Sequence, residues 1–223
     1  MSIRTYPSND FKAVDRSNGT CFHRRMEERS RRIVEAAIEL AEKGGFEAVR
    51  LRDVAAHADV ALGTLYRRFR SKEDLLLAAL ELQVAEHERR VREDPPRGAT
   101  PLARVVALFE VVTGAMCARP NLARALVRSV ASGAPELTVK VAAFHGRMEQ
   151  LITEALRSED GSTSGALSPS AQRRLGSTLL LVWFASLTGW ASGVHGEDGI
   201  LARTRMAAEL MLPDQGGSLP PHG

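Results

Sequence analysis

The sequence predicts an all-α protein of about nine helices. Three features of its 223 residues support this prediction. Apolar residues recur at spacings of three and four, no segment shows the alternation typical of a strand, and Pro or Gly residues interrupt the chain at intervals that suit helices. The hydrophobic content of 44% and the charged content of 26% are ordinary for a globular protein and exclude a disordered chain.

The first helix is expected to begin at Arg24. Residues 1–23 lack apolar periodicity and mix Pro and Asn with scattered charges, so we expect a mobile basic arm there. The Gly44-Gly45 pair should end the helix with a left-handed cap. Between these points, apolar residues fall at i, i+4, i+7 and i+8 on one helical face, namely Ile33, Ala37, Leu40 and Ala41.

Two short helices and one long helix should follow. The short ones are expected over residues 51–58 and 62–69, with a turn at Asp59-Val60 between them. Ser71 has the position of a helix N-cap, with Asp74 at the third helical position, as in a capping box. No Gly or Pro occurs from there to about Glu93, so the long helix is expected to continue to that point.

Five further helices are expected beyond a break at residues 94–98, which contain Pro and Gly. Thr100-Pro101 and Ser168-Pro169 each place an N-cap residue before a proline at the first helical position. Residues 158–167 form a Gly- and Ser-rich loop, and residues 214–223 form a polar tail. The expected helices span residues 101–117, 120–131, 135–157, 169–193 and 198–212.

The charge is distributed unevenly along the chain. The net charge is +3, but residues 1–72 hold 15 Lys and Arg against 10 Asp and Glu (+5), whereas residues 73–223 hold 15 against 17 (−2). Four of the cations lie within residues 60–72, which contain no acid. A focused basic segment of this kind indicates a surface that neutralises phosphates.

Several classes of protein are disfavoured. Cys21 and Cys117 form no CxxC pair and no histidine has metal-ligand spacing, so a disulfide scaffold, a zinc finger and a metal site are unsupported. No nucleophile–base constellation or phosphate loop appears, which argues against an enzyme. The first thirty residues lack the apolar core of a secretory signal, and the uncharged span 176–194 contains too many Ser, Thr and Gly residues for a membrane helix. We therefore expect no cofactor and no membrane partner, and a cytoplasmic, nucleoid-associated protein.

Residues 51–70 have the pattern of a helix-turn-helix. Ala55 is small enough to let the second helix cross the first, and four apolar residues are placed to lock the pair, namely Val54, Val60, Leu65 and Phe69. The second helix would turn small, polar and basic residues outward, as a helix that enters a DNA groove must, namely Gly63, Thr64, Tyr66, Arg67 and Arg68. The surrounding motif matters, because two arginines alone are more often a solvated helix face.

The segment VALGTLYRRFRSKEDLL (residues 60–76) resembles the signature of the TetR family of bacterial transcriptional repressors. The resemblance extends back through Gly44-Gly45-Phe46 and covers about residues 24–76, a third of the chain. The remainder resembles the family in length and helix layout. The resemblance implies an N-terminal three-helix helix-turn-helix DNA-binding domain (residues 24–72) and a C-terminal helical ligand-binding and dimerisation domain (residues 73–213).

The resemblance also implies roles for single residues. Arg52, Tyr66 and Lys72 match positions that contact DNA phosphates. Gly63 matches a position where the backbone approaches DNA, and Thr64 one that contacts a phosphate or a base. Arg67 and Arg68 match positions that contact bases or phosphates, and arginine favours guanine.

The chain departs from the family pattern at three positions. Many members have a capping Ser where this chain has Ala61, a Gly where it has Asp59, and Thr or Ser where it has Arg50. The lost cap at Ala61 should cost about 1 kcal/mol. These departures weaken local capping and leave the groove-facing side unchanged.

Three stretches, KGGFEAV, ADVALGTLYRRF and ARPNLARALVRSV, further resemble actinobacterial repressors of sterol catabolism. That resemblance implies a bulky apolar inducer, such as a steroid or its coenzyme A thioester. Each apolar residue of the second domain is more often core than ligand contact, but as a set these residues would line a cavity between helices. The candidate pocket residues are Leu80, Val84, Phe109, Val112, Met116, Phe144, Met148, Trp183 and Leu187.

The resemblance implies a homodimer as well. The helices at 169–193 and 198–212 would pair with their copies across a low-relief face formed by Leu179, Val182, Ser186, Gly189 and Gly193. The two recognition helices would then lie about 34 Å apart, in successive major grooves of a palindromic operator on double-stranded DNA. An inducer wedged against Leu80 or Val84 would tilt the long helix and change that spacing.

One alternative stays open at this point. A protein of the same fold without a small-molecule inducer would bind DNA and use its helical domain to dock a protein partner. A closed apolar pocket favours the inducer, whereas a filled core with an exposed partner patch favours the alternative.

Overall fold

The computed structural model describes residues 16–157 and 168–212, and every regular element in these two ranges is helical. The all-α prediction is therefore confirmed. The elements are α1 (Arg16–Ala48), α2 (Leu51–His57), α3 (Leu62–Arg68), α4 (Lys72–Glu93), α5 (Pro101–Cys117), α6 (Pro120–Val130), the short 3-10 helix η1 (Pro135–Leu137), α7 (Thr138–Ala155), α8 (Pro169–Ala191) and α9 (Asp198–Met211).

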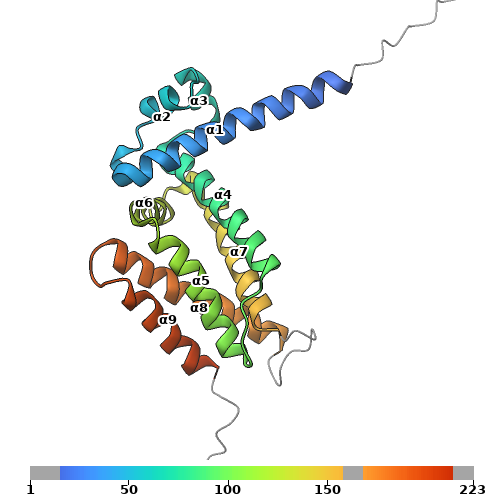
Figure 1. The fold of residues 1–223 in the computed structure, drawn as a ribbon, viewed down its shortest axis with the longest axis vertical. Coiled ribbons are helices and arrows are strands. Elements are labelled where there is room, and N and C mark those ends of the chain that lie inside the picture. Colours follow the sequence, from blue (N-terminus) through green and yellow to red (C-terminus); the bar gives the residue numbers. More distant parts are fainter. Residues whose placement is uncertain (1–15, 158–167, 213–223) are drawn as a thin grey trace, which may run out of the picture.

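Helices α1, α2 and α3 form a head at one end of the molecule (Figure 1). The residues predicted to lock α2 against α3 do so: Val54, Ala55, Leu65 and Phe69 are buried, and Val60 packs against them. Asp59 makes the turn between the two helices with a φ of 52°, in the left-handed region that favours glycine. Ala61 provides no side-chain cap for α3, as expected.

Helix α4 connects the head to the larger body below it (Figure 1). Its start is fixed by the predicted cap, because the Ser71 hydroxyl accepts a hydrogen bond from the Asp74 backbone N–H at 3.1 Å. The Asp74 carboxylate in turn accepts from the Arg70 backbone N–H at 3.0 Å. The helix then packs against α1, α6 and α7, so one rigid element belongs to both the head and the body.

The first helix differs from its prediction at its N-terminus. It begins at Arg16, so residues 16–23 of the predicted mobile arm are helical, while residues 1–15 lie outside the described residues. An established helix adds residues at little cost and needs no apolar periodicity to do so, which is why the pattern did not reveal this extension. At the other end the predicted break is confirmed, since Gly45 has a φ of 66°.

Four of the five body helices begin where the sequence placed them, but the helix predicted over 135–157 starts with the 3-10 turn η1 and α7 begins at Thr138. Thr100 and Ser168 accept hydrogen bonds from the backbone N–H groups of Ala103 and Ala171, at 3.1 and 3.2 Å. Arg104, which is buried, donates to the carbonyl oxygens of Ala155, Gly98 and Leu156 at the end of α7 and the start of α5. The predicted loop 158–167 and tail 214–223 lie outside the described residues.

None of the described helices is by itself long and apolar enough to cross a membrane. Only the consecutive pair α5 and α6 meets the length and composition test together, and it does so across a bend of 108°. One face of the uncharged part of α8 packs into the body instead, with Leu179, Trp183, Leu187 and Trp190 buried.

Candidate nucleic-acid interface and ligand cavity

Most of the residues that the sequence assigned to DNA lie on the two short helices of the head. Arg52 on α2 and Gly63, Tyr66, Arg67 and Arg68 on α3 are exposed, and Thr64 is half-buried. Leu65, between them, is fully buried and holds α3 in place. Six of the seven predicted residues, five exposed and one half-buried, therefore lie on the two short helices of the head.

Three details of this surface suit contact with a phosphate backbone. Arg67 donates to the Thr64 hydroxyl at 3.3 Å, and neither Arg67 nor Arg68 makes an ion pair with a carboxylate in the described part of the chain. A Cβ atom added at Gly63 would meet nothing within 4 Å, so the fold itself does not require glycine there. Tyr66 is 54% exposed, an unusual position for an aromatic side chain without a partner.

Lys72, the seventh residue, has protein partners. Its ammonium group lies 3.8 Å from the ring centroid of Phe46 and 3.4 Å from both the Phe46 carbonyl oxygen and a Glu47 carboxylate oxygen. The hydrogen bonds from Lys72 and Arg128 hold the pKa of Glu47 below its usual range. Lys72 therefore ties the start of α4 to the end of α1 in this structure.

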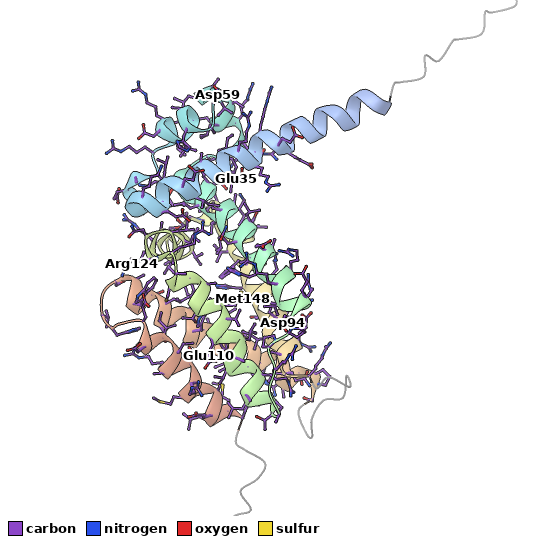
Figure 2. All side chains as sticks on the ribbon, viewed as in Figure 1. Glu35, Asp59, Asp94, Glu110, Arg124 and Met148 are labelled. Atoms are coloured by element: carbon purple, nitrogen blue, oxygen red, sulfur yellow. The ribbon has the colours of Figure 1, made fainter. Side chains whose placement is uncertain are left out.

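A cavity lies in the body between α4, α5, α6, α7 and α8. Its volume is about 60 Å³, which is room for a few water molecules. Its wall is almost wholly apolar, and it includes eight of the nine residues predicted for a pocket: Leu80, Val84, Val112, Met116, Phe144, Met148, Trp183 and Leu187. Figure 2 shows Met148 between the helices of the body.

The prediction for Phe109 is wrong. Phe109 is buried behind Trp183, with the two ring centroids 5.8 Å apart, and does not belong to the residues that line the cavity. Trp183 both lines the cavity and contacts Phe109, and its indole N–H donates to the Thr113 hydroxyl at 2.9 Å, which fixes the ring. Phe109 supports the wall as part of the second layer of the core.

Polar groups gather at one end of the cavity. Three of the nineteen lining residues are polar or titratable, namely Gln83 and His87 of α4 and Arg119, the residue before α6. Burial lowers the pKa of His87, with the nearby Arg90 and Arg119 acting in the same direction, so the neutral imidazole is favoured. None of the three was predicted as a pocket residue, since single polar residues in or beside amphipathic helices give no signal of a cavity.

The predicted dimer face on α8 is corrected by the fold. Leu179 and Ser186 are buried within the chain, because they share the helical face of Trp183, and Val182 is half-buried. Gly189 serves packing within the chain, since a Cβ there would lie 2.7 Å from Nε2 of His195. Of the five residues Gly193 is exposed, in the turn after α8. Exposed apolar side chains on these two helices include Leu181 and Ala185 of α8 and Met206 and Leu210 of α9.

Two ion pairs hold α4 against α7. The Glu88 carboxylate, which is buried, accepts two hydrogen bonds from the Arg147 guanidinium at 2.7 Å each, and these bonds lower the pKa of Glu88. Near the other end of α4, Lys140 lies 2.6 Å from the Asp74 carboxylate. Helix α4, which follows the helix-turn-helix and lines the cavity, is thus held to α7 near both of its ends.

Comparisons with known proteins match both halves of the chain. The model of bacterial regulatory proteins of the tetR family matches residues 33–79, and that of the tetracyclin repressor-like C-terminal domain matches residues 98–211. The HTH-type transcriptional repressor KstR of Rhodococcus jostii (strain RHA1) is 31% identical over 189 residues, which are 85% of each chain.

Solved structures share the fold. A TetR transcriptional regulator from Rhodococcus sp. RHA1 superposes with a TM-score of 0.71 at 24% identity, covering 86% of this chain and 98% of its own. Thermus thermophilus FadR, a TetR-family repressor in complex with lauroyl-CoA, gives a TM-score of 0.68 at 22% identity, covering 87% and 98%. In the described part of the chain, no group of three or more His, Cys, Asp or Glu side chains is placed to hold a metal ion. With its exposed basic recognition helix and its matching C-terminal domain, the chain belongs to the TetR family of bacterial transcriptional regulators.

Proposed function

We propose that this protein is a ligand-responsive repressor that binds a palindromic operator as a homodimer and is released by a bulky apolar molecule, such as a steroid or its coenzyme A thioester. The observation that supports this most directly is the position of α4. One end of this helix lies next to the recognition helix, and its middle forms part of the apolar cavity wall through Leu80 and Val84. A ligand that pushes on this part of the cavity wall would therefore move the helix that supports the head.

The small size of the cavity supports a mechanism of release. Pockets for small molecules usually measure roughly 300–1,000 Å³, so a bulky ligand needs more room than the present 60 Å³. The wall must move outward to admit it, and α4 is part of that wall. A ligand that binds only the widened state shifts the population toward it, and DNA that binds only the narrow state opposes the shift. The names of the relatives agree, since one FadR structure holds lauroyl-CoA.

The test is a gel shift on the DNA upstream of the protein's own gene, with and without a steroid acyl-CoA and lauroyl-CoA. We expect a discrete protein–DNA complex that dissociates when either compound is added. A complex that no apolar compound affects would favour the alternative, a repressor of the same fold that docks a protein partner. The small volume of the cavity favours that alternative, because it leaves no room for a bulky ligand without a movement of the wall.

Tyr66 and Arg52 should affect DNA binding in different ways. Replacing Tyr66 with phenylalanine removes a neutral hydrogen bond to phosphate and should weaken binding to every sequence by about 1 kcal/mol, with the salt dependence unchanged. Replacing Arg52 with alanine removes a cation and should reduce the slope of log K against log salt by about 1. Titrations at four salt concentrations separate the two, and unchanged affinity in either variant would contradict its phosphate role.

The dimer should depend on the exposed apolar residues of α8 and α9. Leu181 is 60% exposed, so a glutamate there leaves the protomer fold intact but places an unpaired charge in the proposed interface. Such a charge costs about 3–5 kcal/mol when buried, so dissociation into monomers should become at least about 100-fold easier. Sedimentation velocity measures this. Val139→Glu, at an 81% exposed site on α7, is the control and should remain dimeric.

A further inference from the structure

We propose that Arg119 binds the anionic end of the ligand and, by leaving Glu42, releases the end of α1 from α6. This inference rests on the proposed function and assigns a chemical class to the ligand: an apolar body that ends in a carboxylate or phosphate. The evidence lies in the partners of Arg119, in its place in the cavity wall, and in what Glu42 holds.

Arg119 is the one permanently charged side chain among the nineteen described residues that line the cavity. It is the residue before α6, and its Nη1 donates to the Gln83 side-chain oxygen at 2.8 Å. Its Nε and Nη2 groups both donate to the Glu42 carboxylate of α1. The only full charge at the cavity is therefore already paired with a carboxylate, the group that a ligand would have to replace.

The exchange of one carboxylate for another is feasible at this position. The side chains of Arg119 and Glu42 are 40% and 35% exposed, so Glu42 can be solvated when Arg119 turns to a ligand. A buried pair would instead leave an uncompensated charge behind. A carboxylate or phosphate matches the two-pronged guanidinium donor, whereas a hydroxyl does not.

Glu42 is one of the points at which α1 is held by α6 and by the residue before it. Its backbone carbonyl accepts a hydrogen bond from Asn121 of α6 at 3.0 Å, and its carboxylate accepts from Arg119. Phe46 and Glu47, which follow the Gly44-Gly45 break in α1, are the partners of Lys72 at the start of α4. Loosening Glu42 therefore frees the segment on which the recognition region rests.

A second ion pair between α6 and α1 supplies a matched control. Arg128 donates to Glu47 at 2.8 Å and lies over the Phe46 ring at 4.0 Å, yet it does not line the cavity. If any weakening of the α6–α1 contact altered induction, Arg128→Gln would act like Glu42→Gln. If the ligand acts through Arg119, Arg128→Gln will leave induction unchanged.

The experiment measures binding of the upstream DNA and of three probes to the full-length protein and to the variants Glu42→Gln, Arg119→Gln and Arg128→Gln. The probes are lauroyl-CoA, laurate and 1-dodecanol, which share a twelve-carbon chain and differ in its end. Fluorescence anisotropy gives the DNA affinity, calorimetry gives the probe affinity, and thermal unfolding verifies that each variant folds.

We expect the two anionic probes, and not dodecanol, to weaken DNA binding by the wild-type protein. In Glu42→Gln the anionic probes should bind about two- to fivefold more tightly, the range of one half-exposed ion pair, and their effect on DNA should fall by the same factor. Arg119→Gln should abolish the preference for laurate over dodecanol, and Arg128→Gln should keep the wild-type ratio. If the anionic probes affect DNA binding in both Glu42→Gln and Arg119→Gln as they do in the wild type, this inference is overturned and the proposed function stands. Failure of every probe to bind the wild type or to affect its DNA binding contradicts the proposed function and the inference with it.

Discussion

Replacing Arg67 with alanine is expected to lower the affinity for the operator by about 1–3 kcal/mol per half-site, which is roughly 5- to 150-fold, and to leave binding to random DNA almost unchanged. The reason lies in its surroundings. Arg67 is exposed on the outer face of α3 and its described partner is the Thr64 hydroxyl, a neutral group that gives way easily to a guanine edge. Because each subunit of a dimer places one Arg67 in one half-site, the loss of binding free energy occurs at both half-sites of the operator.

Competition binding on operator and random duplexes at one salt concentration measures this effect. Arg97→Ala is the control, since Arg97 has the same charge and is exposed in the turn after α4, where it pairs with Asp94. Equal losses on operator and random DNA in Arg67→Ala would move Arg67 from base contact to phosphate contact. Loss of sequence preference in Arg97→Ala would contradict the assignment of DNA recognition to α2 and α3.

Replacing Trp183 with alanine is expected to lower the free energy of unfolding by about 3–5 kcal/mol. Trp183 is 2% exposed, packs on Phe109, and donates to the buried hydroxyl of Thr113, so the substitution leaves a void and an unpartnered polar group together. Chemical denaturation at fixed protein concentration measures the change. Val139→Ala removes an 81% exposed side chain and should cost less than about 0.5 kcal/mol.

The same variant tests the cavity. The space left by the indole ring adjoins the present 60 Å³, so an apolar probe should bind there and restore part of the lost stability in proportion to the logarithm of its concentration. A small loss of unfolding free energy in Trp183→Ala, or no increase in its stability with any apolar probe, would contradict the view that this ring fills the space between the cavity and the core.

The local features of this protein followed from its sequence. The caps at Ser71, Thr100 and Ser168 and the break at Gly44-Gly45 depend on residues within four positions of each other, which a linear pattern contains. The recognition surface was predictable for the same reason, since α2 and α3 together span fewer than twenty residues. The family signature added their roles.

Contacts between distant segments were decided by the tertiary structure. Helical periodicity identifies the apolar faces of α8 but not which of them meets its own chain, so Leu179 and Ser186 were assigned to a partner although Trp183 directs that face inward. Phe109 and Met116 looked alike in sequence, yet Phe109 lies behind Trp183 and Met116 lines the cavity. Arg119 and Glu42 stand 77 positions apart, and only packing of α6 on α1 brings them together. The sequence by itself thus determined the helices, most of their caps and the helix-turn-helix of the head, because short-range spacing encodes them. The cavity, its charged end and its connection to α1 depend on side chains that meet only when the helices pack.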